Sequence, residues 1–187
     1  MSFGFPDEGT PGCNALRNAI LQAHASGILM FAASSNVGAH GTAPAFPASH
    51  SNVFCIYSGD GMGNCAPTNP TARKHLYNFM TLGEAVESAW PRALCANPWK
   101  KRKSGTSFAT PVAAGIAAFL LLYAQQTLPP EQAAQFKQYD KMREWLFHMS
   151  NERGGYNVIS IGRFFNREAR ERKMLLNHLL DGKSWKA

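Results

Sequence analysis

The sequence predicts an α/β fold, in which a parallel sheet packs around a buried central helix and a helical extension follows at the C-terminus. Two short apolar runs, residues 28–33 and 53–57, are typical of strands buried on both faces of a parallel sheet. A segment with helical periodicity precedes the first run, so helix and strand alternate along the chain. Residues 108–125 are apolar on every side, which predicts a helix enclosed in the core.

The N-terminal elements are predicted from local signals. Residues 1–5 are expected to form a strand and residues 6–9 a turn. Thr10 is expected to cap a helix that has Pro11 at its first position, where the missing N–H does no harm. Gly27 is expected to end that helix. Its apolar face is predicted to comprise Ala15, Leu16, Ala19, Ile20 and Ala23.

The rest of the chain is expected to contain a long irregular segment and three helices. Residues 58–105 hold only short apolar pieces, at 79–82 and 85–90. The proline pair after Leu128 ends the central helix. An amphipathic helix is predicted over residues 140–150, and a last helix presents Leu175, Leu176, Leu179 and Leu180 on one face. We therefore divide the chain into residues 1–125 and a helical extension, residues 126–187.

Composition excludes several classes of protein. The 187 residues are 45% hydrophobic and 17% charged, which excludes a wholly disordered chain. No apolar run reaches about 18 residues, so no membrane span is predicted, and residues 1–4 do not resemble a secretory leader. The cysteines lack metal-ligand spacing, so we expect free buried thiols, no metal site and no cofactor. Free thiols and the lack of a visible leader together favour a cytoplasmic location. The cysteines are Cys13, Cys55, Cys65 and Cys95.

The net charge of +7 lies in the second half of the chain. Residues 1–99 carry four basic and five acidic side chains, whereas residues 100–187 carry fifteen and seven. The run Lys100-Lys101-Arg102-Lys103 is most simply a solvated loop beside the candidate site, but it could also favour acidic substrates or bind phosphate. The arginines near the C-terminus and Lys173 are expected on the solvent-exposed face of the last helix. Nucleic-acid binding is disfavoured, because aromatic residues do not alternate with the basic ones.

One motif carries chemistry, the string from Gly105 to Gly115. Ser107 lies at the start of the predicted central helix, where free N–H groups and the helix dipole favour a developing anion. Gly105 allows a sharp turn and close approach of a substrate. Pro111 is tolerated because early helical N–H groups lack partners. A helix-capping residue would be the simple structural explanation of such a serine, and a nucleophile is the chemical one.

The whole string resembles the G-T-S-x-A-x-P-x-x-A-G signature of subtilisin-like serine peptidases. Three further segments are similar to that family over about residues 1–125. Residues 31–38 resemble its A-A-G-N-x-G segment. The lack of a visible leader and the free cysteines resemble intracellular fungal members more than secreted ones. Residues 46–53 resemble its Y-P-A…N-V stretch, and residues 2–4 its S-L-G strand.

The resemblance implies a partial subtilisin-like fold and peptide-bond hydrolysis through an acyl-enzyme. It implies that Ser107 is the nucleophile and that Asn36 donates to the oxyanion together with the Ser107 N–H. A peptide or protein substrate would be flanked by Ser2, Phe3, Gly4, Ala33, Ser34 and Ser35. Ser35 departs from the family, which usually has glycine there, so its side chain is expected to narrow the pocket or twist Asn36.

The family's aspartate and histidine motifs, D-[S/T]-G and H-G-T-H, do not occur in these 187 residues. Asp7 and His24 precede Ser107 in the family's order, but their contexts and spacing differ from it. His40-Gly41-Thr42 copies three letters of the histidine motif yet follows Asn36, so it is expected to be a loop. The chain therefore corresponds to the C-terminal part of a subtilase catalytic domain.

Two functional classes remain open. The first is a serine endopeptidase whose partner is a missing N-terminal subtilase segment, and which is inactive without it. The second is a catalytically inactive interaction module that keeps the fold and the peptide groove. In the first case, apolar residues beside Ser107 are expected to be exposed, because the other segment would cover them.

Overall fold

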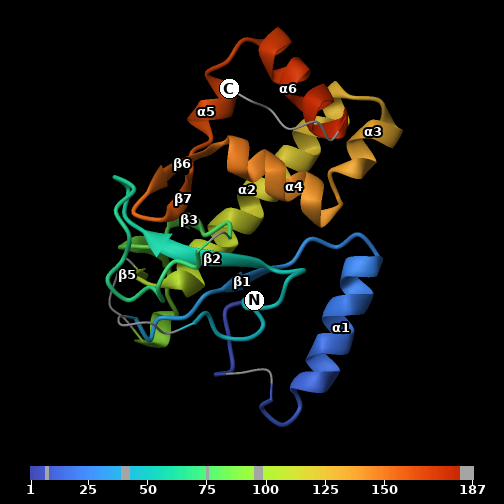
Figure 1. Ribbon diagram of the computed structural model, residues 1–187. Helices are drawn as coiled ribbons and strands as arrows, with labels where there is room; N and C mark the ends of the chain where they lie inside the picture. Colours follow the sequence, from blue (N-terminus) through green and yellow to red (C-terminus); the bar gives the residue numbers. More distant parts are fainter. Residues whose placement is uncertain (7–8, 39–42, 75, 95–98, 182–187) are drawn as a thin grey trace.

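The computed structural model describes residues 1–6, 9–38, 43–74, 76–94 and 99–181. Its central feature is a sheet with strand order β1-β2-β3-β7-β6 among these residues (Figure 1). The strands are β1 Phe31–Ala33, β2 Phe54–Gly59, β3 Phe79–Leu82, β6 Ser150–Arg153 and β7 Tyr156–Ile159. β1, β2, β3 and β7 run parallel, and β6 pairs antiparallel with β7. The predicted α/β class with a mainly parallel sheet is confirmed.

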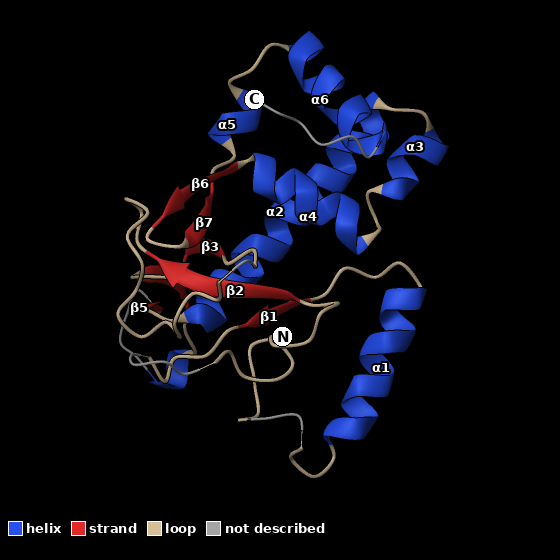
Figure 2. Ribbon diagram, viewed as in Figure 1, coloured by secondary structure: helices blue, strands red, loops and turns tan. Residues whose placement is uncertain are grey.

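Helices cover the sheet and extend beyond it (Figure 2). The central helix, α2 Thr106–Thr127, packs against β1, β2 and β3. In the view of Figure 1, α1 Cys13–Ala25 lies at the lower right, beyond β1, and the C-terminal helices lie in the upper part of the molecule. The latter are α3 Pro130–Gln135, α4 Tyr139–His148, α5 Gly162–Phe165 and α6 Ala169–Asp181. A separate antiparallel ribbon joins β4 Val86–Ala89 to β5 Lys100–Lys103, with a 3-10 turn, Arg92–Leu94, between them.

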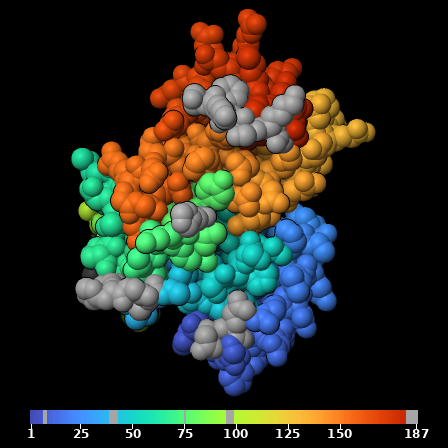
Figure 3. Space-filling view, in the orientation of Figure 1, coloured from blue at the N-terminus to red at the C-terminus, as the bar shows by residue number. Residues whose placement is uncertain are grey.

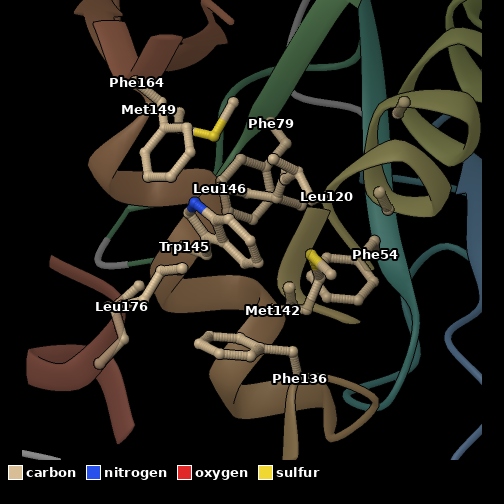
Figure 4. Packing of buried hydrophobic residues seen from close by; sticks show 14 of the residues in the cluster. Phe54, Phe79, Leu120, Phe136, Met142, Trp145, Leu146, Met149, Phe164 and Leu176 are labelled. Atoms are coloured by element: carbon tan, nitrogen blue, oxygen red, sulfur yellow. The ribbon is translucent and has the colours of Figure 1, made fainter. Parts of the chain in front are cut away.

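One hydrophobic cluster joins the sheet to the C-terminal helices. Trp145 of α4 is fully buried and packs against Phe136 and Phe164, with ring centroids 4.7 and 5.4 Å away. Figure 4 shows these rings beside Phe54 and Phe79 of the sheet. In Figure 3 the C-terminal residues, orange to red, lie directly on the rest of the molecule. The domain boundary at residue 125 stays a prediction, and both the sheet and this cluster continue across it.

The N-terminal segment differs from prediction in two details. Residues 1–5 do not form a regular strand, although Met1 bonds along β1: its amino group donates to the Phe31 carbonyl, and its carbonyl accepts from the Ala33 N–H at 3.0 Å. Thr10 does not cap α1. The helix begins after Gly12, whose φ of 89° is a left-handed conformation that glycine adopts easily. Gly27, also left-handed, ends the helix as predicted.

The prediction that α2 is enclosed on all sides was wrong. One face is buried against the sheet, whereas Phe119 and Leu122 on another face are 48% and 50% exposed. Phe119 is 12 residues, or about 18 Å, from Ser107 along the helix. The expected exposure of apolar residues beside Ser107 therefore stays a prediction. By length and composition α2 could also cross a membrane. Core helices of soluble proteins meet the same criterion, and the packing of α2 on three strands is of that kind.

Two other expectations need correction. Residues 58–105 are largely irregular as expected, but they also contain β3, which is a central strand of the sheet, and Lys100–Lys103 is a strand rather than a loop. The basic strand is nevertheless solvent-exposed over three of its four residues. Cys13 and Cys55 are buried thiols outside any disulfide, as predicted, but Cys65 is exposed. Cys95 lies outside the described residues.

Candidate active site

The site is built at the N-terminus of α2, where the chain turns sharply at Gly105. This residue has φ 139°, and its N–H donates to the Gly83 carbonyl at 2.8 Å. A Cβ at position 105 would lie 3.0 Å from the Asn36 amide group. Only glycine therefore permits both the turn and the approach of Asn36. Ser107 follows two residues later, in the first turn of the helix.

Asn36 is held in a single orientation by the start of α2. Its Oδ1 accepts hydrogen bonds from the Thr106 N–H at 2.8 Å and from the Thr106 hydroxyl at 3.1 Å. A backbone N–H can only donate, so the amide oxygen must face Thr106 and the amide nitrogen is left to donate elsewhere. The same bond satisfies one of the N–H groups that a helix start leaves without an intrahelical partner.

Ser2 is tied to the helix by a consequence of Pro111. The carbonyl of Ser107 would ordinarily accept from the N–H of residue 111, but proline has none. The Ser2 hydroxyl donates to that carbonyl at 3.0 Å. Pro111 thus frees an acceptor in the first turn of the helix, and the N-terminal segment uses it. The segment 2–4 is held beside Ser107 in this way.

Residues 34 and 35 bring Asn36 from β1 to the helix. Ser34 is fully buried; its N–H donates to the Ile56 carbonyl and its own carbonyl accepts from Ala45. Ser35 has φ 143°, a conformation that residues with a Cβ rarely adopt. Glycine, usual in the family at this place, adopts it freely. The Ser35 hydroxyl accepts a 3.2 Å hydrogen bond from the Val37 N–H.

A pocket of about 200 Å³ collects most of the predicted site residues. It is lined by Ser2, Phe3, Gly4, Ala33, Ser35, Asn36, Ala45 and Ser107. Ser34 is the one predicted residue that does not line it. Ala45 and the neighbouring Thr106 were not predicted as site residues, although Thr106 lies inside the motif that marked Ser107. The convergence of segments 2–4, 33–36 and 107 is the arrangement the motifs predicted.

The described residues that line this pocket include neither a histidine nor a carboxylate. His24 lies in the last turn of α1, where its ring stands edge-on to Tyr139 at 6.4 Å. Asp7 and His40 are outside the described residues. Within the described part of the chain, no cluster of three His, Cys, Asp or Glu side chains is placed to hold a metal ion.

An apolar groove of about 420 Å³ adjoins this pocket. It lies between the N-terminal segment, β1 and α2, and Ser2 lines both hollows. Its other lining residues are mostly apolar: Met1, Leu29, Met30, Phe31, Thr110, Pro111 and Ala114. The groove thus continues from the Ser107 pocket along one side of the central helix.

Comparison with known proteins decides the family. The model of the subtilase family, Peptidase_S8, matches residues 1–165. The chain belongs to the subtilase family. Subtilases are serine peptidases, so the helix that begins at Thr106 is the one that carries the family's serine motif.

Curated subtilases are similar over about two thirds of the chain. The subtilisin-like protease het-Q2 of Podospora anserina is 36% identical over 129 residues, 67% of this chain and 34% of that protein. Subtilisin DY of Bacillus licheniformis is 32% identical over 65% of this chain and 41% of that protein. Thermitase of Thermoactinomyces vulgaris is 33% identical over 60% and 37%. The subtilase chain described here thus spans between a third and two fifths of these relatives.

Solved structures give the same fold. The prenylagaramide maturation protease PagA superposes with a TM-score of 0.63 at 25% identity, over 79% of this chain and 50% of that one. The PatG macrocyclase domain superposes with a TM-score of 0.62 at 22% identity, over 80% and 42%. The partial subtilisin-like fold predicted from the motifs is confirmed.

Proposed function

We propose that this subtilase chain supplies the nucleophile and the oxyanion-binding side of a peptidase site, with Ser107 forming the acyl-enzyme. The observation that carries the proposal is the fixed orientation of Asn36. Because its Oδ1 is held by Thr106, its Nδ2 is available as a donor in the pocket that Ser107 also lines. A nucleophile and an oxyanion donor that share one pocket are the two parts that acyl transfer needs at the carbonyl.

In the proposed reaction, the Ser107 hydroxyl attacks the carbonyl carbon of a bound peptide. The carbonyl oxygen becomes an oxyanion that accepts from Asn36 Nδ2 and from the Ser107 N–H, which the helix start leaves free. The C–N bond then breaks and the amine leaves with a proton, and water hydrolyses the ester. A base must accept the hydroxyl proton first, because serine is a weak nucleophile at its ordinary pKa.

We further propose that the base and its orienting carboxylate come from an N-terminal subtilase segment, in the same polypeptide or as a partner. The apolar groove beside the Ser107 pocket and the exposed face of α2 would receive that segment. The chain's share of its relatives, 34 to 41%, leaves room for it. In this proposal the chain alone is inactive on peptides.

The test measures hydrolysis of a peptide anilide by the 187-residue chain, alone and with a subtilase segment that carries the D-[S/T]-G and H-G-T-H motifs. We expect activity only with the segment, and none for Ser107→Ala. Asn36→Asp is the sharper variant, because it keeps the acceptor for Thr106 but replaces the donor. Its activity should fall about 10²–10³-fold, the range measured for such a donor in another family member, with the fold intact. If the complemented chain stays inactive, the inactive interaction module becomes the better account.

A further inference from the structure

We propose that the β4–β5 ribbon is a binding surface for an acidic peptide segment that flanks the residues held in the Ser107 pocket. This inference rests on the proposed peptide-binding function. Residues 86–103 contain five basic side chains and one carboxylate, Glu87. They account for +4 of the chain's net charge of +7. The ribbon thus accounts for more than half of the chain's net charge.

The position of the ribbon connects it to the site. Lys103 is four residues from Ser107, so their Cα atoms can be at most about 14 Å apart even in an extended chain. The base of the ribbon is closed by a hydrogen bond from the Ala85 N–H to the Ser104 hydroxyl at 2.9 Å, two residues before α2 begins. Gly105 donates in turn to Gly83. A peptide that occupies the pocket and continues past α2 would therefore pass the ribbon.

One face of the ribbon already holds a carboxylate. Glu87 lies opposite Arg102 in the ladder, and its oxygens are 3.1 Å from Lys100 Nζ and 3.6 Å from Arg102 Nε. The hydrogen bond from Lys100 and its charge lower the pKa of the Glu87 carboxyl. The geometry of the ribbon thus favours an ionised carboxylate on this face. Lys100 and Arg102 both pair with the same carboxylate, that of Glu87.

The other face presents cations without a carboxylate among the described residues of the ribbon. Lys101 and Lys103 project over Trp90, each with its Nζ 5.0 Å from the ring centroid. The ring steadies both ammonium groups, and Lys101 is exposed whereas Lys103 is half-buried. Nothing in the packing of a two-stranded, exposed ribbon calls for adjacent like charges, which repel one another.

An acidic peptide fits these observations better than a nucleic acid does. The two tryptophan rings that bases would stack on are engaged by the ribbon's own cations, since Arg92 lies 4.0 Å from the Trp99 ring and two lysines lie over Trp90. Single-stranded nucleic acid depends on such free rings. Carboxylates of a peptide need only the cations of the ribbon in order to bind.

The experiment measures binding, so that it does not depend on catalysis. Fluorescent peptides share one central apolar sequence and carry four Glu, four Gln or four Lys on either side. The Glu peptide should bind the full chain about tenfold more tightly than the Gln peptide, because exposed ion pairs contribute about 1.4- to 5-fold each. The preference should shrink at high salt.

Matched variants locate the effect. Lys100→Gln, Lys101→Gln and Lys103→Gln together remove three charges from the ribbon and leave Arg102 to pair with Glu87. Lys137→Gln, Arg170→Gln and Lys173→Gln remove three exposed charges elsewhere. Only the ribbon variant should lose the preference for Glu, and thermal unfolding verifies that both variants fold.

Each outcome decides the inference. Equal binding of the Glu and Gln peptides, or a preference that survives in the ribbon variant, overturns it while leaving the proposed function standing. If none of the peptides binds, the inference is overturned, and the result also counts against peptide binding in the Ser107 pocket. An oligonucleotide that binds through the ribbon more tightly than the Glu peptide would replace the acidic peptide with nucleic acid.

Discussion

The Ser2 hydroxyl donates a 3.0 Å hydrogen bond to the carbonyl of Ser107, 105 residues away. The bond exists because Pro111 has no N–H to offer that carbonyl. Ser2→Ala should therefore lower the free energy of unfolding by about 0.5–1.5 kcal/mol, the usual range for one intramolecular hydrogen bond.

A double-mutant cycle isolates this effect. Pro111→Ala restores a backbone N–H that can donate to the Ser107 carbonyl. Ser2→Ala should therefore lower the free energy of unfolding much less in that background. Urea denaturation of the four proteins gives the coupling energy. An equal cost of Ser2→Ala in both backgrounds would show that the proline does not create the acceptor.

Ser35 is held at a φ of 143°, so its Cβ carries strain. Ser35→Gly relieves the strain, whereas Ser35→Ala keeps it, and both remove the hydroxyl that accepts from Val37. The glycine variant should be more stable than the alanine variant by about 1 kcal/mol. This is the relief of strain less the stability that glycine loses through its greater entropy in the unfolded chain. Thermal unfolding of the pair tests this, and a more stable alanine variant would be evidence against strain at this position.

Two glycines should respond in opposite ways to the same substitution. A Cβ at Gly83 would lie 2.4 Å from the Ser58 hydroxyl and 2.9 Å from the Ala109 Cβ, so Gly83→Ala should destabilise by about 1–3 kcal/mol. Gly115 lies within α2 with open space around it. Gly115→Ala should stabilise the helix by up to about 1 kcal/mol. Chemical denaturation compares them, and similar midpoints would contradict the packing around Gly83.

The cysteines should differ in reactivity. Burial raises the pKa of the Cys55 thiol to about 11, so at pH 8 nearly all of it is the unreactive protonated form. Cys65 is exposed. Iodoacetamide should alkylate Cys65 and spare Cys55 until the protein is unfolded, as peptide mass spectrometry can follow. Equal rates in the native protein would mean that β2 opens readily.

Much of the site could be predicted because its residues lie in two short, ordered motifs. The motif around Ser107 begins a helix and that around Asn36 follows a buried strand, and the resemblance of both motifs to those of subtilases implies that the two residues meet. What the motifs could not supply was contact between distant segments. The role of Pro111 depends on Ser2, and the turn at Gly105 depends on Asn36, which no local pattern reveals.

The wrong predictions have a related cause. Hydrophobicity on every side of residues 108–125 indicated burial, but burial depends on what packs against each face, and one face of α2 is exposed in this chain. The basic run at 100–103 looked like a loop because lysine favours neither strand nor burial. It forms a strand because it pairs with residues 86–89, a segment that itself gave only a weak signal.

The most direct measurement is the site of modification by a fluorophosphonate probe, mapped by mass spectrometry on the full chain with and without the complementing subtilase segment. We predict slow labelling at most for the chain alone and labelling of Ser107 when the segment is present, abolished by Ser107→Ala. Fast labelling of Ser107 in the chain alone would contradict the account, because a base would then lie within these residues. So would labelling of another serine in the complemented protein.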